Sequence, residues 1–210
     1  MARPTDLNPR RRPVQERSQA TVSAILEAAT QVFARHGYAA GTTNRIAERA
    51  GVSIGTLYQY FPNKDALLVA LAESHLREAE GILRPVMIEL SLRPPPLREG
   101  LELMVSAAME SHRQEPRLHG VLFEEAPRPP ALRERLDQAF ESACHVLAGY
   151  LELRPEVHVT DSAVAAQLVV QSIEAITHGL VIHPRGDATP EDYSREVATM
   201  LERYLTADTP

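Results

Sequence analysis

Hydrophobic positions recur at helical spacing along most of the chain. Residues 15–36 carry one apolar stripe, and two short stripes follow between residues 42 and 61. Longer stripes cover residues 63–89, 97–113, 131–153, 162–182 and 191–205, and a short one begins at Pro116. An apolar residue at every third or fourth position buries one face of a helix. Because no segment reads convincingly as a strand, the pattern predicts an all-α protein.

Glycines and prolines punctuate this pattern. Gly37 is expected to stop the first helix, Pro62 ends the third, and Pro85 kinks or ends the helix that follows. Proline-rich segments at residues 91–96 and 126–130 interrupt the second half. We therefore expect four parts: a flexible basic arm over residues 1–14, a three-helix domain over 15–62, a connecting helix over 63–90 and a helical C-terminal domain over 91–210.

The two short helices surround Gly51. Thr42 or Thr43 is expected to cap the first, Ser53 caps the second, and Gly51 supplies the positive φ of the turn. Leu57 and Phe61 face the core. The remaining positions of the second helix are expected to be less buried: Ile54, Gly55, Thr56, Tyr58, Gln59 and Tyr60. This layout is that of a helix-turn-helix, which places its second helix in a groove of DNA.

The charges divide along the chain in a way that suits a DNA-binding N-terminus. The net charge is −6, but residues 1–70 hold nine Arg/Lys and five Asp/Glu, whereas residues 71–210 hold thirteen and twenty-three. A basic domain joined to an acidic one is typical of a DNA-binding part carried by a domain that binds something else.

The sequence lacks the features typical of secreted and membrane proteins. Cys144 is the only cysteine, so no intrachain disulfide forms. No apolar run approaches the ~18 residues of a membrane span, and the arginine-rich N-terminus has no apolar segment typical of a secretory signal. We therefore expect a cytoplasmic protein that has no membrane partner.

The letters GY followed by TTNRIAERAGVSIGTLYQYFPNKDALL, within residues 18–68, carry a family resemblance. They resemble the DNA-binding domain of the tetracycline-repressor family of bacterial transcription regulators. Gly41 departs from the family pattern, in which threonine or serine is common, and is expected to loosen the turn before the next helix. The resemblance implies a regulator, most often a repressor, that binds a palindromic operator as a homodimer and is released by a small molecule.

Side-chain chemistry suggests how the N-terminal domain meets DNA. Arg45 suits a guanine edge, Asn44 suits an adenine, and Gly55 lets the helix backbone approach closely. Hydroxyls at helix starts, Tyr60 and Lys64 suit phosphates. The predicted DNA contacts are Thr43, Asn44, Arg45, Ser53, Ile54, Gly55, Thr56, Tyr58, Gln59, Tyr60 and Lys64. The Arg10–Arg12 run is equally consistent with a DNA-contacting arm and a solubilising tail.

Residues 162–182 are apolar around most of the helix circumference, so more than one side must be covered. One side is expected to meet its own domain and another a second copy of the chain. The alternative is a buried core helix with no partner. The resemblance implies a dimer built from the last two helices, and the predicted interface residues are Ala165, Val169, Ile173, Ile176, Val197, Met200, Leu201 and Tyr204.

The resemblance also implies a small-molecule pocket in the C-terminal domain. Methionine and aromatic side chains suit an adaptable apolar site. The candidates are Met104, Ala108, His112, Phe123, Phe140, Cys144, Tyr150, Ile173, Thr177 and His178. For each of them the alternative is ordinary core packing.

An enzyme is the second class to weigh. Eight histidines, with Glu124, Glu125 and Cys144, invite a metal interpretation, and Glu174 and His178 share a helix face. However, the chain has no HExxH, paired CxxC, GxSxG or phosphate-binding glycine loop. We therefore predict no catalysis, no cofactor and no metal site. A helical adaptor for protein partners is a third class, and it leaves the basic N-terminus unexplained.

Overall fold

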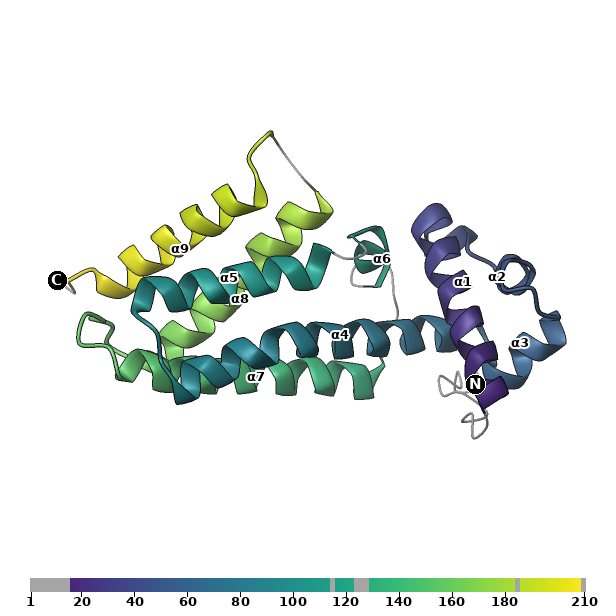
Figure 1. Ribbon diagram of the computed structural model, residues 1–210, viewed down its shortest axis with the longest axis horizontal. Helices are drawn as coiled ribbons and strands as arrows, with labels where there is room; N and C mark the ends of the chain where they lie inside the picture. Colours follow the sequence, from purple (N-terminus) through teal and green to yellow (C-terminus); the bar gives the residue numbers. More distant parts are fainter. Residues whose placement is uncertain (1–15, 114–115, 123–128, 184–185, 209–210) are drawn as a thin grey trace, which may run out of the picture. The chain divides into compact units, whose positions relative to one another are not determined.

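The computed structural model describes residues 16–113, 116–122, 129–183 and 186–208 (Figure 1). Within these ranges the chain is helical and has no strand, which confirms the predicted all-α class. The predicted arm over residues 1–14 and the pocket candidate Phe123 lie outside the described residues. The chain divides into two compact units, which we call the head unit (residues up to 76, with 117–133) and the body unit (residues 77–116, with those from 134 onward).

The head unit is built around α1 (Glu16–Ala40), α2 (Thr43–Arg49) and α3 (Ile54–Tyr60). Gly37 has φ 72° and interrupts the regular geometry inside α1, where the sequence predicts a stop. Helix α1 contacts α2, and α2 contacts α3. Apolar side chains from each helix are fully buried, as periodicity requires: Ile25, Phe33, Ile46 and Leu57.

Helix α4 (Lys64–Leu92) is longer than the sequence predicts. It does not end at Pro85 but continues for seven residues beyond it. Proline inside a helix costs about 3 kcal/mol, because one hydrogen bond is lost and the ring crowds the preceding turn. Val86 and Leu90 are buried in the body core, and each fully buried side chain of this size contributes about 1.5–3 kcal/mol. Burial just past Pro85 therefore offsets the proline.

The body unit contains the rest of α4, the helices α5 (Leu97–Arg113), α8 (Ser162–Ile182) and α9 (Pro190–Thr206), and α7 (Pro130–Glu152) from residue 134 onward. The short α6 (Pro116–Gly120) follows α5 in the chain. Helix α5 contacts both α8 and α9, and these three helices lie together in Figure 1. Asp161 caps α8 by accepting from the N–H groups of Ala163 and Val164. Helix α8 therefore has the bounds and the cap that the sequence predicts.

Helix α8 is long and apolar enough, by length and composition alone, to cross a membrane. This differs from the expectation that no segment approaches such a span. The helix nevertheless carries Gln167, Gln171 and Glu174, and one of its faces is buried in the body core through Ala165, Ala166, Val169 and Ile173. The helix is therefore apolar for two reasons: one face packs in the core of the body unit, and a second apolar face is exposed.

Candidate nucleic-acid interface

The turn between α2 and α3 is fixed by the backbone of Gly51. Its φ is 67°, in the left-handed region that a glycine adopts without strain. The Gly51 N–H donates to Glu48 O at 3.1 Å, and the Val52 N–H donates to Ala47 O at 3.0 Å. These two bonds form a Schellman motif, which satisfies carbonyls that the helix end leaves open. The predicted glycine turn is confirmed.

Each short helix begins at a hydroxyl cap. Thr42 Oγ1, the first of the two predicted alternatives, accepts from the Arg45 N–H at 3.4 Å. Ser53 Oγ accepts from the Thr56 N–H at 3.0 Å and lies 2.8 Å from Thr56 Oγ1. The two caps orient α2 and α3 around the turn.

Helix α3 has one buried and one exposed face. Leu57, Tyr60 and Phe61 are buried, because positions i, i+3 and i+4 share a face. Tyr60 is only 9% exposed, so the expectation that it is a less buried position is wrong. Tyr58 is 40% exposed, and its hydroxyl lies 3.1 Å from Thr43 Oγ1 on α2.

The exposed residues of the two helices form one candidate interface, which we call the α2–α3 surface. Thr43 is partly buried, and the other members are exposed: Asn44, Arg45, Ser53, Ile54, Gly55, Tyr58 and Gln59. A Cβ built on Gly55 would approach only Ser53 Oγ, at an ordinary 3.7 Å. Packing within the chain therefore does not require a glycine at position 55.

Lys64 is engaged by the protein itself. Its Nζ donates to Tyr38 O at 2.7 Å and to Ala39 O at 3.4 Å, and it lies 3.9 Å from the centre of the Tyr38 ring. The Tyr38 hydroxyl also bonds to Asp65 Oδ1. The lysine thus ties the end of α1 to the start of α4. Its predicted phosphate contact stays a prediction, alongside this structural role.

Two arginines near Arg45 were missed by sequence reasoning. Arg35 on α1 and Arg49 on α2 line, with Arg45, a shallow hollow of about 390 Å³ in the head unit. The spacing of Arg45 and Arg49 at i and i+4 was the available signal. Three arginines against the single acidic lining residue Glu48 make this hollow basic.

Gly41 is a packing position. It is buried, and a Cβ built there would lie 2.5 Å from Phe33 Cδ1 and 3.0 Å from Gly37 O. Its N–H donates to Gly37 O at 3.1 Å. The expectation of a loosened turn is therefore wrong, because the missing side chain lets this segment close against the Phe33 ring.

Five of the eight residues predicted for the dimer interface point into the protein instead of outward. These five are buried in the core of the chain's own body unit: Ala165, Val169, Ile173, Val197 and Leu201. Ile176 packs against the same core. Because consecutive helix residues are about 100° apart, the outward apolar side of α8 instead carries Val164 and Leu168. The predicted Met200 and Tyr204 of α9 are exposed, and we call these four exposed side chains the α8–α9 face.

The predicted pocket residues are only partly brought together. Met104, Ala108 and His112 on α5, and Ile173, Thr177 and His178 on α8, belong to two helices in contact. Phe140 is exposed, whereas Cys144 is buried and desolvation raises the pKa of its thiol.

Tyr150 is a structural residue. Its hydroxyl lies 2.8 Å from Pro95 O and 3.0 Å from Pro96 O and shares its one proton between them, so it holds the proline-rich loop after α4. Burial, the largest cause, raises the pKa of this hydroxyl. The assignment of Tyr150 to a ligand pocket is therefore not supported by its contacts.

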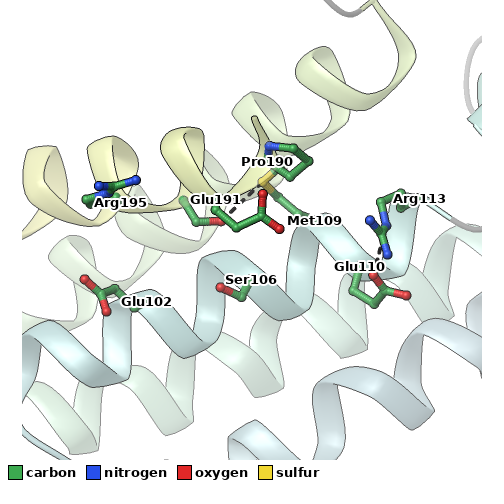
Figure 2. A pocket seen from close by; sticks show the side chains of 9 residues that line it. Glu102, Ser106, Met109, Glu110, Arg113, Pro190, Glu191 and Arg195 are labelled. Carbon is green, nitrogen blue, oxygen red and sulfur yellow. Dashed lines mark hydrogen bonds and ion pairs between the residues drawn. The ribbon is translucent and has the colours of Figure 1, made fainter. Parts of the chain in front are cut away.

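A hollow of about 550 Å³ lies between α5 and α9 (Figure 2). None of its lining residues belongs to the predicted pocket: Glu102, Ser106, Met109, Glu110, Arg113, Pro190, Glu191, Ser194 and Arg195. Arg113 Nε lies 3.1 Å from Glu110 Oε2 along one wall, and Ser194 Oγ lies 3.4 Å from Met109 Sδ across the hollow. Its charged lining differs from the apolar site that the sequence predicts.

Two segments of the chain match models of known protein families. Residues 25–71 match bacterial regulatory proteins of the tetR family, and residues 96–205 match the tetracyclin repressor-like C-terminal domain. The chain is 39% identical over 98 residues to the HTH-type transcriptional repressor KstR of Rhodococcus jostii, covering 45% of this chain and 42% of that protein. It is 39% identical over 67 residues to the repressor AcnR of Corynebacterium efficiens, covering 31% and 36%. The matches thus span less than half of these relatives.

Solved structures share the fold over nearly the whole chain. A TetR-family transcriptional regulator from Mesorhizobium loti superposes with a TM-score of 0.70 at 22% identity, covering 91% of this chain and 98% of that one. NalD, a repressor of a multidrug efflux pump in Pseudomonas aeruginosa, superposes with a TM-score of 0.67 at 22% identity, covering 93% and 100%. At this identity the likeness concerns the fold.

Proposed function

The chain belongs to the tetracycline-repressor family of bacterial regulatory proteins, and from this we propose that it is a cytoplasmic, DNA-binding transcriptional repressor. It binds a palindromic operator as a homodimer, and a small molecule bound by the body unit releases it. The observation that carries the proposal is the α2–α3 surface, where two capped helices around Gly51 present polar and apolar side chains outward.

The exposed face of α3 supports insertion into a major groove. Ile54 and Tyr58 are large and mainly apolar, yet they are left exposed on a helix whose other face is buried. Apolar side chains in this position suit thymine methyl groups, and Gln59 suits a base edge. Gly55 fits the same role, because packing within the chain leaves its position open and close approach to DNA explains a missing side chain.

Phosphate contacts would surround this face. Ser53 and Thr43 lie at the starts of α3 and α2, where hydroxyls and open N–H groups suit an anion. The basic hollow lined by Arg35, Arg45 and Arg49 adds positive charge beside α2. Phosphate contacts position the helix, whereas base contacts select the sequence.

The α8–α9 face supports the proposal of a homodimer. Val164 and Leu168 lie on one helix, Met200 and Tyr204 on another, and α8 contacts α9. A two-fold dimer would bury the same patch from both copies and set the spacing of the two α3 helices. Consecutive major grooves require that spacing to be about 34–36 Å. A molecule that binds the body unit better at another spacing would weaken DNA binding.

The test is selection from a pool of random duplexes by the full-length protein at low ionic strength. We expect an inverted repeat with half-sites about one helical turn apart. Arg45→Ala should lower the affinity for the selected duplex, whereas Arg93→Ala, at an exposed arginine of the body unit, should not. A pool that shows no enrichment, or an equal effect of the two substitutions, would overturn the proposal.

A further inference from the structure

Three polar side chains of the body unit gather where the C-terminal part of α5 meets α8. His112 Nε2 lies 3.3 Å from Glu174 Oε1. The His112 and His178 rings meet edge to face, with centroids 5.9 Å apart and an interplanar angle of 85°. A ring nitrogen of His112 lies within 4.8 Å of a ring nitrogen of His178. We propose that His112, Glu174 and His178 bind a divalent transition-metal ion, with Zn²⁺ as the best-suited species.

The spacing fits a shared ion. Zinc binds histidine nitrogen and carboxylate oxygen at about 2.0–2.2 Å in a tetrahedral arrangement, which places neighbouring donor atoms about 3.3–3.5 Å apart. The His112–Glu174 distance already has this value. Glu174 and His178 are four residues apart on α8, so they share one helix face as paired zinc ligands do.

The surroundings of His112 favour a lone pair directed at this point. The Ser111 hydroxyl donates to Ala108 O at 2.8 Å, so its oxygen accepts from His112 Nδ1–H, also at 2.8 Å. A neutral ring that donates through Nδ1 carries its lone pair on Nε2. His112 Nε2 faces the Glu174 carboxylate, so a cation bound between them would accept the nitrogen lone pair on one side and carboxylate oxygen on the other. An orienting hydrogen bond on the second ring nitrogen is also the usual companion of a metal-binding histidine.

The site has one buried ligand and one exposed ligand. The His112 side chain is 6% exposed, whereas that of Glu174 is 57% exposed. A hydrated ion can therefore meet the carboxylate first and reach the imidazoles behind it. Two histidines and one carboxylate leave a fourth position for water or for an oxygen of another ligand. The ion would join α5 to α8. This inference is independent of DNA binding, because every readout is taken without DNA.

The experiment uses the full-length chain, freed of metal with a chelator and titrated with Zn²⁺ against a chromophoric competitor. We expect one strongly bound Zn²⁺ per chain. Co²⁺ should give the intense absorption of a four-coordinate site. Glu174→Gln and His178→Ala should each weaken Zn²⁺ binding at least 10-fold, and Ser111→Ala should weaken it about 10- to 100-fold. Circular dichroism reports whether each variant is folded.

Matched controls are Glu152→Gln and His145→Ala, two exposed residues of α7, which should bind Zn²⁺ as the unchanged protein does. Absence of stoichiometric binding would overturn the proposal and leave His112–Glu174 as an ion pair only. Binding that persists unchanged in folded Glu174→Gln and His178→Ala proteins would also overturn it, because the ion would then be held elsewhere.

Discussion

Leu168→Glu is expected to separate the dimer without unfolding the chain. Leu168 is 48% exposed on α8, in the α8–α9 face. Full burial of a leucine side chain contributes about 1.5–3 kcal/mol, so burying the exposed half contributes roughly 1 kcal/mol. A two-fold interface contains the residue twice, which doubles this to about 2 kcal/mol. The dimer dissociation constant should therefore rise about 30-fold, and desolvation of two carboxylates should raise it further.

The assay is sedimentation over a range of protein concentrations, together with thermal unfolding. Leu153→Glu is the matched control, because Leu153 is 62% exposed and lies outside the α8–α9 face; it should leave the dimer intact. Val169→Glu places a carboxylate at a fully buried position of the body core, so it should lower the melting temperature instead. A Leu168→Glu protein that sediments as the unchanged dimer would refute the assignment of this face.

Three further substitutions test the head unit and the body unit. Arg45→Ala should lose discrimination at particular base pairs, which affinities for single-base variants of the selected operator would show; uniform weakening would instead indicate a phosphate contact. Lys64→Ala should lower the melting temperature, because the lysine's hydrogen bonds to Tyr38 O and Ala39 O are lost. If Lys64 also neutralises a phosphate, the substitution should reduce the slope of log affinity for the operator against log salt concentration by about 0.9. Tyr150→Phe leaves two loop carbonyls without its hydroxyl and should destabilise the fold by about 1–3 kcal/mol in denaturant unfolding.

Local rules were sufficient for the helix-turn-helix. The turn at Gly51 and the cap at Ser53 depend on neighbours within five residues, and both are present. The bounds of α8 follow from Asp161 and the apolar run in the same way. Such features need no knowledge of distant contacts, so the sequence alone predicts them.

Orientation about a helix axis was harder to predict. Because α8 is apolar on most sides, periodicity does not distinguish Leu168 from Val169, although one is exposed and the other is fully buried. Tyr60 presents the same problem, since its aromatic ring suits either the core or a surface. Only the packing of the whole unit decides which side turns inward.

Contacts between distant segments were beyond the sequence altogether. Lys64 binds carbonyls 25 and 26 residues earlier, and Gly41 is required by the Phe33 ring. His112 meets Glu174 from another helix, although only the pairing of Glu174 with His178 is visible in the sequence. Such pairs follow from tertiary packing, which no local pattern encodes.

Hydroxyl-radical footprinting of the selected duplex tests most directly whether two copies of α3 enter DNA together. The proposal predicts two protected segments on each strand, related by two-fold symmetry and centred about one helical turn apart. A single protected segment, or protection spread evenly along the duplex, would contradict it.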